Sequence, residues 1–293
     1  MAVELTNHFN AAVAGVPHCY PVEPTEMEAA LTPAAQGDDK HLEAESVIVA
    51  RNNGAIFGVA HFGISNGDDK NPERTGIIRF LHFERGQRAV GQALLEAVQD
   101  DLRQHQIDRI NAFSQRYRYR FYGFNHAYLS NHLDHVEALL GYNEYEKAGG
   151  EVFLDSINYM PQPPASINLQ FDIVLEWLDG PGARQDLTLR AVDGDRQLGE
   201  CQSISCQTFS RNEALKDWHF CNWLGVEEEV QGKGLGRYLL QQARLEMHKV
   251  GYRHAGISTA WRNYRAFQFY SNDGYRLSDW TYAWEKDRSP DLS

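Results

Sequence analysis

The sequence has few of the features that mark secreted, metal-binding or nucleic-acid-binding proteins. Its 293 residues include four cysteines, which have neither zinc-site spacing nor the density of a disulfide scaffold: Cys19, Cys201, Cys206 and Cys221. Basic residues are outnumbered by acidic ones, 28 to 40, and the resulting formal charge of -12 argues against binding to a phosphate backbone. We therefore expect reduced thiols, a cytoplasmic location, no metal and no nucleic-acid partner.

Long apolar runs and a signal segment are also lacking. The run GAIFGVAHFGI, at 54–64, is too short to span a bilayer and contains a histidine. The opening MAVELTNHFNAAVAGVP shows no basic region followed by an apolar one. Because 42% of the residues are hydrophobic, the chain can still fill a core. The sequence thus predicts a folded protein without membrane contact.

A proline-rich stretch, NYMPQPPAS at 158–166, separates two halves in which the same elements are expected in the same order. Each half opens with a hairpin signal, at Asn53 and Gly54 in one and at Asp193 and Gly194 in the other. An apolar strand, an amphipathic helix, a helix ending in Gly-Tyr and a final hairpin follow. We predict a duplicated α+β unit, with domains at 1–160 and 161–293.

The amphipathic helices of the two halves align without a gap. Gly91 falls on Gly236, Leu94 on Leu239 and Leu102 on Met247 when the sequences are offset by 145 positions. Apolar residues recur three and four positions apart in both, which is typical of a helix packed on a sheet.

Three glycines alternate in the loop QGKGLG, at positions 232, 234 and 236, just before the second of these helices. Ordering glycine costs more backbone entropy than ordering any other residue, so a local need for bare backbone is indicated. Such a loop presents main-chain N–H groups and the positive end of the helix dipole to one point, which suits an anion. The spacing matches neither GxGxxG nor GxxxxGK[ST], and a tight turn without a ligand is an equal alternative on spacing alone.

The residues around this loop resemble the GNAT superfamily of acyl-CoA-dependent N-acetyltransferases. QGKGLG, after the strand segment LGV, is similar to motif A, [Q/R]-x-x-G-x-[G/A], and STAWRNYRAFQFYSNDGYR at 258–276 resembles motif B. The resemblance is strong over 187–286 and weaker over 46–155. It implies a tandem GNAT protein of α+β class, in which each domain is a twisted mixed β-sheet flanked by helices.

The resemblance also implies acetyl-CoA as co-substrate and a set of residues that bind it. The main chain of the strand end would contact the pantetheine arm, and the glycine loop would hold the pyrophosphate. The amide of Asn263 would contact pantetheine, and the same side chain is equally suited to cap the following helix. The expected binding residues are Leu224, Gly225, Val226, Gln231, Gly232, Lys233, Gly234, Leu235, Gly236, Arg237 and Asn263.

Tyr270 is the candidate catalytic acid. A phenol with a pKa of about 10 can protonate a departing thiolate whose own pKa is about 8.5, although a tyrosine of the core is the alternative. An amine acceptor must also lose a proton, and Glu227 and Glu228 are the nearest carboxylates in sequence. A solvated acidic turn explains them equally well, and His219, Glu200 or a water chain are further candidates for the base.

We interpret the chain as an acetyl-CoA-dependent N-acetyltransferase that acts by direct attack of a primary amine. The alternative is a non-catalytic acyl-CoA-binding or scaffold protein with a retained fold. The acceptor is a small molecule or a protein amine, and the acidic run at 227–229 favours a cationic one. A homodimer is compatible with the sequence.

The first half departs from the family pattern. Gly86 and Ala89 fall on Gln231 and Gly234, and counting back from Gly-Tyr puts Ser130 and Glu137 in place of Asn263 and Tyr270. The first half is therefore expected to keep the fold without the chemistry. The second half lacks room for the two helices that usually wall the acceptor side, so we expect the first half or a partner subunit to supply that wall.

Other stretches carry weaker expectations. The segment RYRYRFYGF, at 116–124, is expected to pack between the halves rather than to bind RNA. Three histidines near one helix, His126, His132 and His135, lack the companions of a metal site. Segments 68–74 and 286–293 are expected to be an exposed loop and a frayed end.

Overall fold

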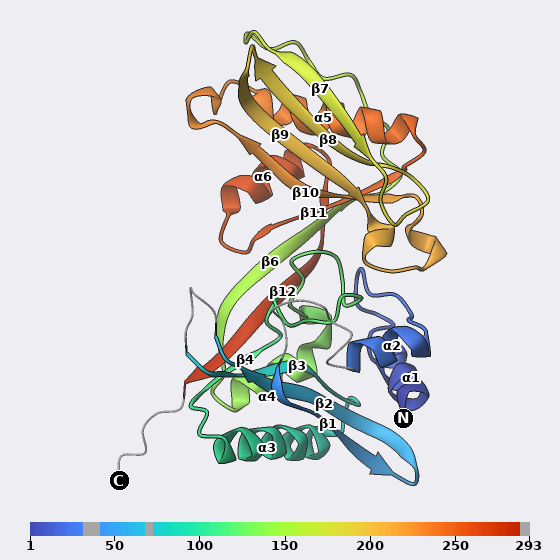
Figure 1. The fold of residues 1–293 in the computed structure, drawn as a ribbon, viewed down its shortest axis with the longest axis vertical. Coiled ribbons are helices and arrows are strands. Elements are labelled where there is room, and N and C mark those ends of the chain that lie inside the picture. The colour runs from blue at the N-terminus through green and yellow to red at the C-terminus, as the bar shows by residue number, and fades with distance from the viewer. Residues whose placement is uncertain (32–41, 68–72, 288–293) are drawn as a thin grey trace. The chain divides into compact units, whose positions relative to one another are not determined.

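The computed structural model describes residues 1–31, 42–67 and 73–287, which form two compact units (Figure 1). The first unit contains residues 1–151 and the end of the chain from Asp279, and the second contains Val152–Ser278. This division differs from the predicted boundary after residue 160. Two strands pass from one unit to the other: β6 (Glu146–Ser156) begins in the first unit, and β12 (Arg276–Asp287) begins in the second.

The first unit is a mixed sheet with helices packed against it. Strands β1 (Glu43–Asn52), β2 (Ala55–Ser65), β3 (Thr75–Phe83) and β4 (Arg109–Ala112) are neighbours in that order, β12 follows β4, and the short β5 (Leu129–Ser130) pairs with β12. The helices are α1 (Ala2–Ala12), α2 (Pro24–Leu31), α3 (Arg88–Gln104) and α4 (Asp134–Tyr142). The predicted first hairpin is confirmed, because Asn52 pairs with Ala55 across Asn53 and Gly54.

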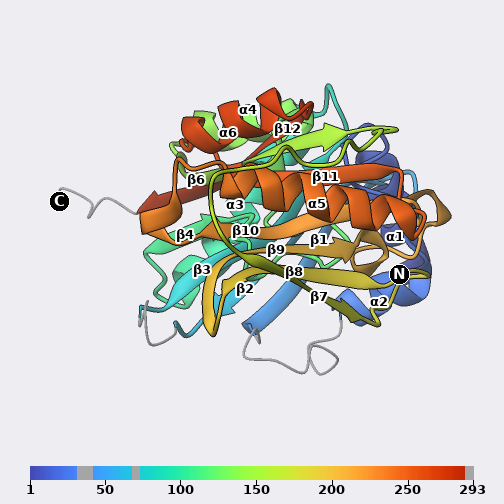
Figure 2. The ribbon, with the colours of Figure 1, turned by 90° about the horizontal axis from the view of Figure 1, so that it is seen from above.

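The second unit has the strand order β11-β10-β9-β8-β7, with the end of β6 beside β11. Its strands are β7 (Asp172–Leu178), β8 (Asp186–Asp193), β9 (Arg196–Ser205), β10 (Trp218–Val226) and β11 (His254–Ala260), and its helices are α5 (Leu235–Lys249) and α6 (Tyr264–Asn272). The predicted second hairpin is confirmed by the pair Asp193 and Arg196. Helix α5 lies along β8, β9 and β10 on one face of the sheet (Figure 2).

The predicted alignment of the two amphipathic helices is confirmed by their buried faces. Helix α3 buries Leu94, Leu95, Val98 and Leu102, and α5 buries Leu239, Leu240, Ala243 and Met247, each exactly 145 positions later. The same pattern of side chains therefore docks each helix on its own sheet.

The predicted match between the second helices of the two halves is wrong by three residues. Helix α4 continues through the Gly-Tyr pair at 141–142 and turns only at Glu144, which has a φ of 65° where Gly274 has 88°. The next residue closes the same turn in both units: the N–H of Tyr145 bonds to Leu140 and that of Tyr275 to Tyr270, both at 3.1 Å. The Gly-Tyr pair marks this turn in the second unit only, because the first unit has a glutamate at the position with positive φ.

The counterparts in the first unit change accordingly. Leu133 precedes α4 as Asn263 precedes α6, and Leu140 takes the place of Tyr270, instead of Ser130 and Glu137. Both replacements are apolar and buried, so the first unit still offers neither an amide nor a phenol at these two positions.

The aromatic segment at 116–124 packs in the core of the first unit. Tyr119 and Tyr122 lie against Phe80 of β3, and Phe121 lies against Phe9 of α1. Within the segment, Arg118 donates to the carbonyl of Tyr122 at 2.9 Å. Most of the predicted loop at 68–74 and of the predicted frayed end at 286–293 lies outside the described residues.

Within the described ranges, no helix combines the length and the apolar character that a membrane crossing needs.

Asp279 makes the stability of the first unit depend on pH. Its side chain is 4% exposed, and burial raises its pKa to about 7, against the opposing effect of a hydrogen bond with Ser130. The folded chain therefore holds one more proton than the unfolded chain between about pH 4 and 7, and stability falls as pH rises through that window. We expect Asp279→Asn to raise the urea unfolding free energy at pH 8 relative to wild type and to lose this advantage near pH 4. Parallel pH profiles of the two proteins would contradict this assignment.

Candidate functional site

The strand before the glycine loop separates from its parallel neighbour. Strand β10 pairs with β11 from Trp218 to Cys221, and beyond that point it pairs with β9 alone. A register shift against β9 lies between Cys221 and Trp223, which is the signature of a β-bulge and increases the local twist. Among the described residues, no second strand therefore lies beside the main-chain groups of residues 223–226 that point away from β9.

The loop that follows depends on glycine for its backbone path. Gly232 has a φ of 76° and Gly234 has a φ of 91°, a region that side chains with a Cβ rarely adopt. Helix α5 begins directly after Gly234, and its first main-chain hydrogen bond runs from Tyr238 to Gly234 at 3.0 Å. The N–H groups of residues 235–237 therefore precede the helical ladder and lie where the dipole favours an anion.

A cavity of about 620 Å³ joins this loop to the open edge of β10 and to α6. Of the residues predicted to bind acetyl-CoA, the structure brings all except Lys233 to its wall, together with Tyr270. Trp223, Val230, Arg265, Ala266 and Phe269 also line it and were not predicted. Trp223 and Phe269 could have been noticed from sequence, because they flank the two motifs, but aromatic residues there are equally typical of a core.

Tyr270, on α6, and Asn263, which immediately precedes this helix, both line the cavity. Tyr270 is 8% exposed and packs against Phe269 and Tyr275. The Oδ1 atom of Asn263 accepts the N–H of Ala266 at 3.1 Å, so the side chain caps α6 while it also lines the cavity. The two roles considered for Asn263 are therefore compatible.

The charged side chains on the cavity wall are cationic. They are Arg237, whose Nε lies 3.1 Å from Asp273, and Arg265. Among the described residues that line the cavity, none is a carboxylate. Glu227 and Glu228 are exposed at the end of β10, outside this wall, and Glu229 forms an ion pair with Arg196.

The other candidate bases, His219 and Glu200, also belong to the second unit, and neither lines the cavity. His219 is buried and within 3.1 Å of the Tyr159 hydroxyl, and burial lowers its pKa to about 3. Glu200, on β9, lies directly opposite Gly225 and accepts hydrogen bonds from Arg190 and Gln202, both at 2.8 Å.

The corresponding region of the first unit is built differently. Four residues, 84–87, connect β3 to α3, whereas eight, 227–234, connect β10 to α5. Ala89 lies inside the first turn of α3, and two arginines of this region have partners within the unit. Arg85 pairs with Asp134, and Arg88 lies over the ring of Tyr142.

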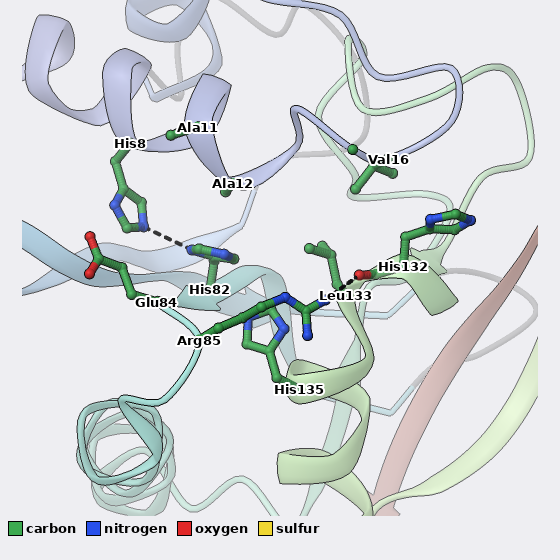
Figure 3. A pocket seen from close by; sticks show the side chains of 11 residues that line it. His8, Ala11, Ala12, Val16, His82, Glu84, Arg85, His132, Leu133 and His135 are labelled. Carbon is green, nitrogen blue, oxygen red and sulfur yellow. Dashed lines mark hydrogen bonds between the residues drawn. The ribbon is translucent and has the colours of Figure 1, made fainter.

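A separate cavity of about 450 Å³ lies in the first unit, between α1, the end of β3 and the start of α4 (Figure 3). Imidazoles line it: the Nε2 atom of His8 lies 3.0 Å from the Nδ1 atom of His82, and His135 donates to the carbonyl of Phe83 at 2.9 Å. Burial lowers the pKa of His82 to about 3. In the part of the chain that the structure describes, no three His, Cys, Asp or Glu side chains are grouped to hold a metal.

Comparisons with known proteins agree with this geometry. The family described as "Acetyltransferase (GNAT) domain" matches residues 186–277. The fold is similar to a tandem GNAT protein from the clavulanic acid biosynthesis pathway, with 13% identity and a TM-score of 0.66 over 99% of this chain and 95% of that one. It is also similar to a GCN5-related N-acetyltransferase from Sphaerobacter thermophilus, with 13% identity and a TM-score of 0.61 over 100% and 94%.

A third similar structure is a GCN5-related glucosamine N-acetyltransferase region in a fungal multi-domain GH3 β-N-acetylglucosaminidase. The identity is 15% and the TM-score 0.65, and the match covers 98% of this chain but 37% of that one. No curated protein sequence matches the chain significantly. Residues 186–277 therefore form a GNAT domain, and the chain as a whole has the fold of tandem GNAT proteins.

Proposed function

We propose that the protein is an acetyl-CoA-dependent N-acetyltransferase whose active site is the cavity of the second unit. The observation that carries the proposal is the continuity of this one cavity. The bare glycine loop, the unpaired edge of β10 and the phenol of Tyr270 all line it. The reaction requires an anion site for the diphosphate of the donor, a main-chain edge for its pantetheine arm and a proton donor for the departing thiolate.

Binding of the donor would use the main chain at both ends of the cavity. The N–H groups at the start of α5 would hold the diphosphate, with Arg237 adding positive charge. The open edge of β10 would pair with the amides of the pantetheine arm as a neighbouring strand would. Main-chain N–H groups near Val226 would polarise the thioester carbonyl.

The chemical step would be direct attack of a neutral primary amine on the thioester carbon. A tetrahedral intermediate forms, the carbon–sulfur bond breaks, and the Tyr270 hydroxyl gives its proton to the departing thiolate. The amine must lose a proton in the same sequence. Glu227 and Glu228 remain the predicted bases, and because neither lines the cavity, the proton would reach them through water.

Asn263 offers a test that separates donor binding from helix capping. We expect Asn263→Ala to lower the unfolding free energy by about 1 kcal/mol, because α6 loses its cap, and to weaken acetyl-CoA binding. Asn263→Asp keeps the capping acceptor but lacks the amide donor, so it should keep the stability and still bind acetyl-CoA weakly. Titration calorimetry and urea unfolding measure the two effects. Normal acetyl-CoA affinity in Asn263→Asp would rule out the pantetheine contact.

The alternative is a non-catalytic protein that binds acyl-CoA, and thiol release separates the two. We expect free CoA to appear from acetyl-CoA in the presence of at least one member of a panel of primary amines. The panel should include glucosamine, since one similar structure is described as a glucosamine N-acetyltransferase region. Tight binding of acetyl-CoA without turnover of any amine would favour the alternative, a non-catalytic protein that binds acyl-CoA.

A further inference from the structure

One face of the second unit's sheet carries a row of polar side chains that ends at the candidate active site. Gly199 lies on the face of the sheet that α5 covers, because an added Cβ there would meet Leu239 of α5 at 3.0 Å. Successive residues of a strand point to opposite faces, so Glu200 lies on the face away from α5. Strand pairing puts Glu200 directly opposite Gly225, and Gln202 directly opposite Trp223. Directly opposed residues share a face, so these four positions form one patch at the open edge of β10.

The carboxylate of Glu200 is held in place within a ladder that has surplus negative charge. Arg190 lies between two glutamates, with its Nη1 atom 2.8 Å from Glu176 and its Nε atom 2.8 Å from Glu200. Gln202 donates to the other oxygen of Glu200 at 2.8 Å. Two carboxylates share one guanidinium, and the Glu200 side chain is only 15% exposed, so this partly desolvated site favours a further cation.

Trp223 provides an aromatic surface over Gly225, the residue directly opposite Glu200. Its side chain lies against Gly225, where an added Cβ would meet the indole Nε1 atom at 3.1 Å. The residue is nevertheless 58% exposed, and it lines the cavity that contains Tyr270. Gly225 thus leaves room for the ring to lie against the strand, and an indole face is the aromatic surface that attracts cations most strongly.

We propose that Trp223 and Glu200 recognise the acceptor, and that the acceptor is a diamine or polyamine. The proposal rests on the proposed N-acetyltransferase function. An amine held against a carboxylate and an indole face is stabilised in its protonated form, which cannot attack a thioester. The group recognised here is therefore a second cation of the substrate, and the reacting nitrogen is a different one. The arginines on the cavity wall, Arg237 and Arg265, keep that cation away from the diphosphate end.

Matched substrates test this inference directly. Thiol release is measured with acetyl-CoA and either 1,4-diaminobutane or 1-aminobutane, which differ only in the second amine. We expect kcat/KM of the wild-type protein to favour the diamine by at least about tenfold, through KM. Glu200→Gln and Trp223→Ala should each remove most of this preference, measured as the ratio of kcat/KM for the two amines at saturating acetyl-CoA.

Glu176→Gln is the matched control, because Glu176 contacts the same arginine at the same distance but does not lie opposite Gly225. It removes the same charge from the ladder but keeps the carboxylate opposite Gly225, so it should reduce the diamine preference clearly less than Glu200→Gln does. Trp223→Phe keeps an aromatic ring and should retain part of the preference, which guards against a loss caused by misfolding of the alanine variant.

Two results would overturn the inference while the proposed function stands. The first is equal use of the two amines by the wild-type protein. The second is a fall in kcat for both amines in Glu200→Gln, which would make Glu200 the general base. If no amine, including the diamine, releases thiol although acetyl-CoA binds, the proposed function itself fails, and the acceptor site fails with it.

Discussion

The Tyr270→Phe variant is expected to bind acetyl-CoA normally and to lose about a hundredfold or more in kcat. Loss of a positioned general acid costs about 10²- to 10⁴-fold, and the substitution removes only the hydroxyl from a side chain that is 8% exposed. The ring would still pack against Phe269 and Tyr275, so folding should be preserved. Steady-state thiol release and titration calorimetry with acetyl-CoA measure the two quantities.

Tyr275→Phe is the control for this experiment. Tyr275 is fully buried, does not line the cavity, and its hydroxyl has no hydrogen-bond partner among the described residues. Its removal should leave kcat within about twofold. If Tyr270→Phe retains full activity, the phenol is a core residue and the proton comes from another group or from water.

The second large effect is expected for Gly232→Ala, which should weaken acetyl-CoA binding at least tenfold. Nothing lies within 4 Å of the position that the new Cβ would take, so the methyl group would project into open space, where the proposed diphosphate binds. Losing one hydrogen bond to a charged group corresponds to about 1.5–3 kcal/mol, which is a tenfold change in affinity or more.

Gly194→Ala separates this effect from backbone strain. Gly194 has a positive φ of 59° in the hairpin between β8 and β9, it also has nothing within 4 Å, and it lies outside the cavity. Both variants should lose a similar amount of stability, about 1 kcal/mol, because alanine disfavours this backbone region. Only Gly232→Ala should lose acetyl-CoA affinity. Equal affinities in the two variants would mean that the loop is a turn and not an anion site.

Local patterns allowed much of the second unit to be predicted. The alternation of glycines located the start of α5, and the buried face of that helix follows the spacing of Leu239, Leu240, Ala243 and Met247. The hairpins around residues 53 and 194 were likewise predictable, since a tight turn between strands needs residues that tolerate a positive φ. These features depend on neighbours within a few positions, which a sequence displays directly.

Features that depend on distant partners were not predictable in the same way. The turn after α4 uses Glu144 with a positive φ, so the Gly-Tyr pair at 141–142 misled the alignment by three residues. Strand β12 ends in the first unit because its pairing with β4 joins positions such as Ala112 and Trp284. The patch of Trp223 and Glu200 arises from strand register and a bulge, and neither leaves a short-range signal.

A crystal structure of the wild-type protein with CoA tests the central claim most directly. The account predicts density for the diphosphate within hydrogen-bonding distance of main-chain N–H groups between residues 232 and 237, and for the pantetheine arm along residues 223–226. The claim would be contradicted if crystals grown with saturating CoA showed no ligand at this loop, or showed CoA bound at another place on the chain.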